Sequence, residues 1–163
     1  MIVMKQSTVF NVRKLVKQCI TVLALSGGML GVIHTGLAHD AAATMDSVGN
    51  SATFTGYGFV TCFDDGNGPA DKLVASVRDH SPPVPGLLVN LQILKGNRAA
   101  SVSDPVSGDG NGSPSISVKG GNGVYLILVN KTAPGARDFS IEYHCTTAND
   151  VHTGTDIGVY QFE

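Results

Sequence analysis

The sequence of 163 residues contains no tryptophan, and its other aromatic residues are only four tyrosines and six phenylalanines. An immunoglobulin domain proper packs a core tryptophan against its disulfide. That architecture in its strict form is therefore disfavoured, and any hydrophobic core must be built mainly from aliphatic side chains. All seven prolines fall after residue 38, which indicates frequent turns in the rest of the chain.

Acidic residues are missing from the first seventeen positions, which carry four basic ones and lead into an apolar run over 19–33. Small residues follow at Gly36 and Ala38. This order is typical of a secretory signal peptide. We predict a signal peptide over 1–38 that is cleaved after Ala38, with cleavage after Ala43 as an alternative. An uncleaved anchor over 19–38 would be long enough to span a membrane, but its glycines are unfavourable there.

Cleavage after Ala38 leaves 163 − 38 = 125 residues, which is the size of one domain. It removes four of the eleven basic residues and none of the thirteen acidic ones, so the net charge becomes 7 − 13 = −6. An acidic chain is unsuited to binding nucleic acid. We expect a periplasmic or extracellular protein with no stable membrane span after cleavage, whose partner is an unknown protein, glycan or surface.

Three cysteines are present, and Cys19 would leave with the signal peptide. Cys62 and Cys145 would then enter an oxidising compartment as the only pair, which predicts a disulfide between them. They are 145 − 62 = 83 positions apart and lack the CxxC spacing of redox or metal-binding thiols. A bridge that closes so long a loop stabilises the folded state by about 4 to 5 kcal/mol in the chain-entropy account.

Short segments of alternating or continuous apolar residues, separated by turn residues, predict strands. They cover 52–62, 72–79, 87–95, 98–103, 115–119, 124–129, 138–145 and 155–162. The continuous apolar segment 124–129 predicts a central strand buried on both faces. We predict an all-β fold over 51–163, a small antiparallel β-sandwich of jelly-roll or Ig-like type with seven to eight strands. The small, polar segment 39–50 is expected to form a flexible arm.

Three segments resemble the second half of bacterial pre-peptidase C-terminal domains, in which a D-P-x-x-G turn precedes a G-x-Y strand and a closing strand that contains tyrosine. They are Asp104-Pro105-Val106-Ser107-Gly108, Gly123–Val129 and Phe139–Tyr143. The resemblance covers about residues 87–143. It implies a secreted, jelly-roll-like β-sandwich of a kind commonly appended to proteases, where such domains assist secretion or bind substrate. No protease motif accompanies it here, so the resemblance bears on fold more than on role.

The new N-terminus suggests a metal site. If the signal ends at Ala38, the α-amino group and the imidazole of His39 can together chelate copper(II), which favours such nitrogen ligands. Further ligands are expected from His144, on the solvent-facing side of its strand, and His152, in the following loop. His80 and Met45 are the other available donors. The alternative interpretation is that these histidines are scattered over the surface.

Two loops rich in oxygen donors suggest calcium, which takes six to eight oxygen ligands. The candidate ligands are Asp64, Asp65 and Asn67 in the first loop and Asp104, Asp109 and Asn111 in the second. Neither loop completes a helical calcium-binding pattern. Because Asp, Asn and Gly are also the ordinary residues of turns, simple turns are the alternative.

Catalytic signatures such as GxSxG, HExxH or a free cysteine with a histidine partner are missing, so we do not expect an enzyme. The leading hypothesis is a non-catalytic secreted or periplasmic β-sandwich with a binding or structural role. The alternative is a copper-binding periplasmic protein that uses His39. A further alternative is a subunit of an extracellular assembly, in which the arm or the last strand pairs with a neighbour's sheet edge.

Overall fold

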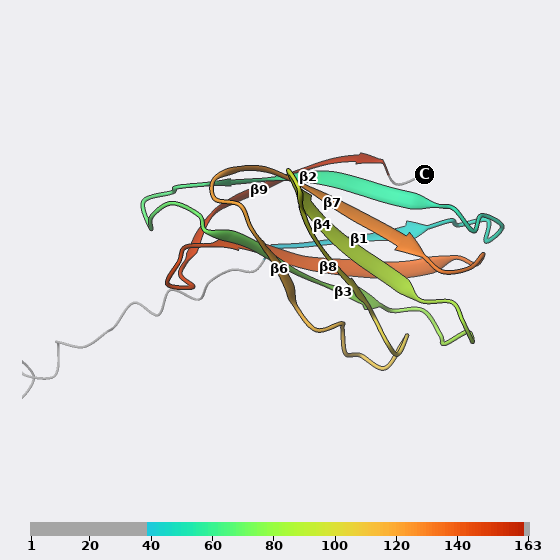
Figure 1. Ribbon diagram of the computed structural model, residues 1–163. Coiled ribbons are helices and arrows are strands. Elements are labelled where there is room, and N and C mark those ends of the chain that lie inside the picture. Colours follow the sequence, from blue (N-terminus) through green and yellow to red (C-terminus); the bar gives the residue numbers. More distant parts are fainter. Residues whose placement is uncertain (1–38, 162–163) are drawn as a thin grey trace, which may run out of the picture. The chain divides into compact units, whose positions relative to one another are not determined.

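The computed structural model describes residues 39–161 (Figure 1). The predicted signal peptide and the cleavage position after Ala38 therefore border on, or lie outside, the described residues. Ala43, the alternative cleavage position, lies inside a strand.

Nine antiparallel strands and no helix make up the described part of the chain, which confirms the all-β prediction. The strands are β1 (His39–Met45), β2 (Thr55–Phe63), β3 (Lys72–Asp79), β4 (Val89–Lys95), β5 (Arg98–Ser103), β6 (Ile116–Lys119), β7 (Gly123–Lys131), β8 (Arg137–Thr146) and β9 (His152–Gln161). Strands β3 and β5 have the bounds that the sequence predicts.

The strands form two layers joined along one side (Figure 1). The first layer contains β1, β8, β3 and β6, and the second contains β5, β4, β7, β2 and β9. Strand β9 belongs to both, because its first residues pair with β8 whereas Gly154–Gln161 pair with β2. This crossing makes the two layers one continuous, nearly closed sheet.

The core lies between the layers and is mainly aliphatic, as the scarcity of aromatic residues requires. In β3 every second side chain is buried, because successive residues of a strand point to opposite faces. Strand β8 places Phe139, Ile141, Tyr143 and Cys145 in the core in the same way, as its predicted alternation indicates.

Three local predictions differ from the structure. His152 does not lie in a loop but is the first residue of β9, paired with Thr146 of β8. Residues 39–45 do not form a flexible arm but pair with β8 as β1, because Ala41 and Ala43 pack against the core and Met45 is fully buried. Strand β7 is not buried on both faces. Its inner residues are buried, but Val124 is 53% exposed, because no further layer of the described chain covers the outer face.

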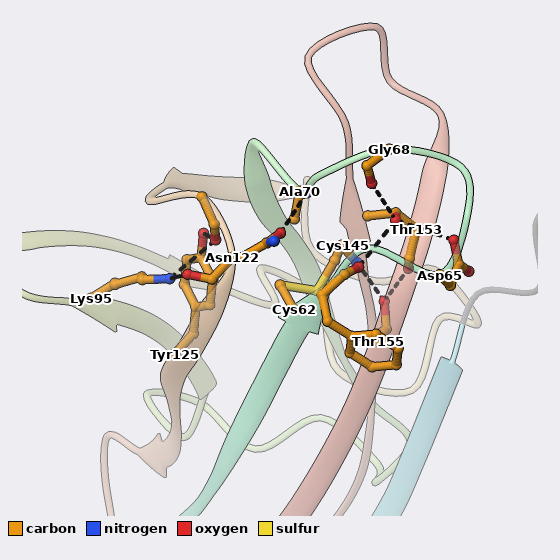
Figure 2. Close-up of a disulfide and its surroundings, with 12 residues drawn as sticks. Cys62, Asp65, Gly68, Ala70, Lys95, Asn122, Tyr125, Cys145, Thr153 and Thr155 are labelled. Atoms are coloured by element: carbon orange, nitrogen blue, oxygen red, sulfur yellow. Dashed lines mark hydrogen bonds between the residues drawn. A yellow bond between two sulfur atoms is a disulfide. The ribbon is translucent and has the colours of Figure 1, made fainter.

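The disulfide joins Cys62 of β2 to Cys145 of β8 and so links the two layers across the core, with 5.6 Å between the Cα atoms. Figure 2 shows the threonines of β9 around it. The Thr155 hydroxyl accepts a hydrogen bond from the backbone N–H of Cys145 at 2.9 Å, and the fully buried Thr153 hydroxyl donates to the Gly68 carbonyl at 2.7 Å. The bridge is therefore anchored where β9 crosses between the layers.

We predict that Cys62→Ala combined with Cys145→Ala lowers the free energy of unfolding by about 2 to 5 kcal/mol, because the unfolded chain regains the entropy of an open loop. Urea unfolding of the oxidised wild type and of the double variant measures the change. Reducing agent should destabilise the wild type alone. Equal urea midpoints for the two proteins would contradict the prediction.

A buried ion pair fixes the loop that follows β1. The ammonium of Lys131 lies 2.5 Å from the carboxylate of Asp46, and both side chains are buried. The same carboxylate accepts N–H bonds from Gly49, Asn50 and Ser51. The Lys131 ammonium lowers the pKa of Asp46 from 3.8 to about 2, with the backbone bonds acting in the same direction.

Because the pKa of Asp46 is lower in the folded chain, the unfolded chain binds more protons between pH 4 and pH 2. The stability that Asp46 provides is therefore complete above pH 4 and is lost as the pH falls to about 2. We expect Asp46→Asn to destabilise the protein at pH 7 and to flatten this acid dependence, as measured by urea unfolding at several pH values. Asp40→Asn, at an exposed position of β1, is the control and should retain the wild-type profile.

Candidate functional site

Strands β1 and β9 share one edge of β8. His39 of β1 lies opposite Tyr143, and Thr153 of β9 lies opposite Cys145. Strand β9 pairs with residues 145–146 of β8 and then crosses to the other layer, and β1 pairs with residues 137–143 along the rest of the same edge. We call this place, formed by residues 143–146, 152–153 and 39, the fork.

The fork brings together the three histidines that the sequence suggests as metal ligands. The ring centroids of His39 and His152 are 5.6 Å apart, and those of His144 and His152 are 6.0 Å apart. His39 also stacks on Tyr143, with centroids 5.8 Å apart. Each of the three histidines is half-buried. They come from the start of β1, the end of β8 and the start of β9, and they meet because all three strands meet there.

Two imidazole nitrogens at the fork are buried and have no hydrogen-bond partner within residues 39–161. They are Nδ1 of His144 and Nε2 of His152. A buried polar atom left unpaired costs roughly 1 to 3 kcal/mol. A metal ion or a hydrogen-bonding group bound to these two nitrogens would remove that cost.

The three rings do not yet form a coordination sphere. Within the described residues, no group of three or more His, Cys, Asp or Glu side chains is arranged as a set of metal ligands. The rings of His144 and His152 are stacked at 26° to each other, so their nitrogens do not converge on one point. Metal binding at the fork therefore requires rotation of these side chains about their χ angles.

The electrostatics of the fork favour the neutral form of His144. Burial lowers the pKa of His144 below its ordinary value of 6.5, and the nearby His152 and His39 act in the same direction. Glu142 opposes the shift. A histidine must be neutral at its ligating nitrogen to bind a metal ion, so the fork holds His144 in the form that binding needs at neutral pH.

We expect an NMR titration to give His144 a pKa below 6.5 and His152→Gln to raise it, because that substitution removes a neighbouring positive charge. Since the folded chain then binds fewer protons than the unfolded chain, stability should fall as the pH drops below 6.5. His80→Gln is the matched control. An unchanged pKa of His144 in the His152→Gln variant would contradict this coupling.

The two other predicted donors lie away from the fork. His80 is exposed and its Nε2 atom is hydrogen-bonded to the Ser140 hydroxyl at 2.8 Å. The side chain of Met45 is fully buried in the core. Neither residue can contribute a ligand without a large rearrangement.

The two oxygen-rich loops lie near opposite ends of β3. Asp64, Asp65 and Asn67 precede β3, and Asp65 lies 3.3 Å from the hydroxyl of Thr153. Asp104, Asp109 and Asn111 follow β5, where the buried Asp104 accepts a hydrogen bond from the N–H of Asp79 at the end of β3.

Hydrogen bonds within their own loops occupy most of these carboxylates. Asp64 accepts N–H bonds from Gly66 and Gly68, and Asp109 accepts one from Asn111. This is the ordinary arrangement of Asx turns. The structure does not bring the two loops together, and calcium binding by either one stays a prediction.

Sequence reasoning missed β1 and the surface beside it. The alternation of Ala41, Ala43 and Met45 indicates a strand, but only weakly, because alanine has a low strand propensity. It also missed the contact of Tyr57, Phe59 and Tyr160 on the outer face of β2 and β9, where the Phe59 and Tyr160 rings lie 5.1 Å apart.

Searches of protein-family models, curated proteins and solved structures find no match for this chain. The resemblance to pre-peptidase C-terminal domains therefore stays a prediction. Within residues 39–161, no helix is long and apolar enough to cross a membrane. The disulfide fits a protein of the periplasm or the extracellular space, where thiols are oxidised.

Proposed function

We propose that this chain is an exported, non-catalytic binding protein and that its fork binds one copper(II) ion. The observation that carries the proposal is the meeting of His39, His144 and His152 from three different strands. The two buried imidazole nitrogens support it, because they can bind a metal ion and have no hydrogen-bond partner within the described chain.

The proposed ligand set contains only nitrogen atoms. Signal cleavage after Ala38 supplies the α-amino group of His39, which forms a chelate with its own imidazole. His144 and His152 supply one imidazole each. Copper(II) binds such nitrogen donors more tightly than the other common divalent metals of the first transition row. Small rotations of the rings complete the site, since their centroids already lie within 6.0 Å of a neighbour.

The position of β1 supports cleavage after Ala38. Cleavage after Ala43 would remove most of a strand that pairs with β8 over seven residues. It would also uncover core side chains that Ala41 and Ala43 contact. Cleavage after Ala38 leaves β1 whole and places its first residue at the fork.

The test uses the mature protein isolated from the compartment to which it is exported. We expect His39 as the N-terminal residue, one copper per chain by elemental analysis, and nitrogen hyperfine structure in the electron paramagnetic resonance spectrum. His144→Gln and His152→Gln should each weaken copper binding by about tenfold or more. His80→Gln is the matched control and should bind as the wild type does.

Two results would overturn the proposal. An N-terminus at Thr44 would remove the chelate altogether. Copper affinity unchanged in both His144→Gln and His152→Gln would show that the N-terminus alone takes up copper and that the fork is not the site. Circular dichroism of each variant separates loss of binding from loss of the fold.

A further inference from the structure

An apolar pocket opens between β1 and β9, on the side of the fork toward which the two strands diverge. Its walls include Ala41 of β1, Phe139 and Ile141 of β8, and Ile157 and Val159 of β9. The rest of the lining comes from β2 and β7 and contains no charged residue. Its open volume is about 360 Å³, solvent at the mouth included. We call this pocket and its two flanking strands the slit.

Both strands that flank the slit have an unpaired edge. Within residues 39–161, β1 pairs only with β8, and β9 pairs only with β2 from Gly154 onward. Their second edges therefore present backbone N–H and C=O groups that no described strand satisfies. Such edges are templates for a further strand.

The dimensions of a sandwich suit one added strand. Neighbouring strands lie about 4.8 Å apart and packed sheets about 10 Å apart. At the ordinary distance between packed sheets, one extended segment placed between two edges lies one strand spacing from each. Every second side chain of that segment would point into the apolar pocket. A small apolar molecule would fill the pocket but would leave both edges unpaired.

The outer rim of the slit is acidic. Asp40 of β1 lies directly opposite Glu142 of β8, and both side chains are exposed. Like charges placed opposite each other destabilise a strand pair. Asp156 of β9 is also exposed, and neither β1 nor β9 contains a lysine or arginine.

An aromatic ring of β9 lies on the outer face of the sheet, where Tyr160 packs against Tyr57 and Phe59 of β2. Tyr160 is 66% exposed on the outer side of β9 and suits a cation–π contact. Glu142 already lies 4.0 Å from the Arg78 guanidinium of β3. A segment with basic side chains at its outward positions would compensate the two remaining carboxylates, Asp40 and Asp156. A second copy of this acidic chain would not supply that charge.

We propose that the slit accepts an extended segment of a partner protein, with apolar side chains at alternate positions and lysine or arginine between them. The segment completes the sheet between β1 and β9 and hydrogen-bonds to both edges. Main-chain bonds provide affinity and the pocket selects the apolar side chains, as in other cases of strand addition. The inference is independent of copper binding at the fork.

The test measures binding of a nine-residue synthetic peptide of alternating valine and lysine to the exported protein by calorimetry. Two control peptides carry glutamate in place of lysine or N-methyl groups on alternate amides. Ala41→Phe fills the pocket from β1, whereas Ala42→Phe is the matched control on the exposed face of the same strand. We expect Ala41→Phe and both control peptides to weaken binding by about tenfold or more, and Ala42→Phe to have little effect.

Hydrogen exchange on the unmodified protein gives a second readout that does not depend on any variant. The peptide should slow exchange of the backbone amides of 39–45 and 154–161. Protection of amides elsewhere would overturn the proposal. Equal binding of the N-methylated peptide would also overturn it and would indicate a pocket that takes apolar groups without strand pairing. A dimer in sedimentation that is dissociated by the peptide would show instead that a second copy occupies the slit.

Discussion

The shared edge of β8 is the constraint on which the other features depend. One strand cannot pair along its whole edge with two neighbours, so β9 pairs with it briefly and then crosses to the second layer. Strand β1 uses the edge that β9 vacates. This exchange joins the layers into one sheet, brings the starts of β1 and β9 to the same place, and forces the two strands to separate beyond it. The fork lies where β1 and β9 begin side by side, and the slit lies further along, where they have separated.

The sequence predicts much of the fold because the signals involved are local. Alternation in β3 and β8 follows from burial of one face. The prediction of the Cys62–Cys145 bridge rests on assigning Cys19 to the predicted signal peptide and the remaining pair to an oxidising compartment, and the structure contains the bridge. Strand β1 escaped prediction because small residues carry little hydrophobic signal. Its pairing depends on an edge of β8, nearly a hundred residues later, that the segment's own composition does not reveal.

The sequence predicts which residues form the candidate site but not that they meet in space. Residue chemistry selects His39, His144 and His152, but their meeting depends on a strand that changes layers, which no local pattern encodes. His144 and His152 are close in sequence, near the end of β8 and at the start of β9, so one turn brings them together. His39 is more than a hundred residues away and reaches them only through the register of β1 on β8. The slit had no sequence signal, because its walls come from five strands.

The position of the disulfide links oxidation of the chain to the place where the histidines meet. Cys145 lies between His144 and Thr146 in the chain and faces Thr153, the neighbour of His152. Oxidation therefore ties the strand that carries His144 to β2 at the place where the histidines gather. A chain in a reducing compartment lacks this tie, and a chain that keeps the predicted signal peptide lacks the free amino group that the proposed copper site needs at His39. Under the proposed function, export would separate synthesis of the chain from completion of its copper ligands.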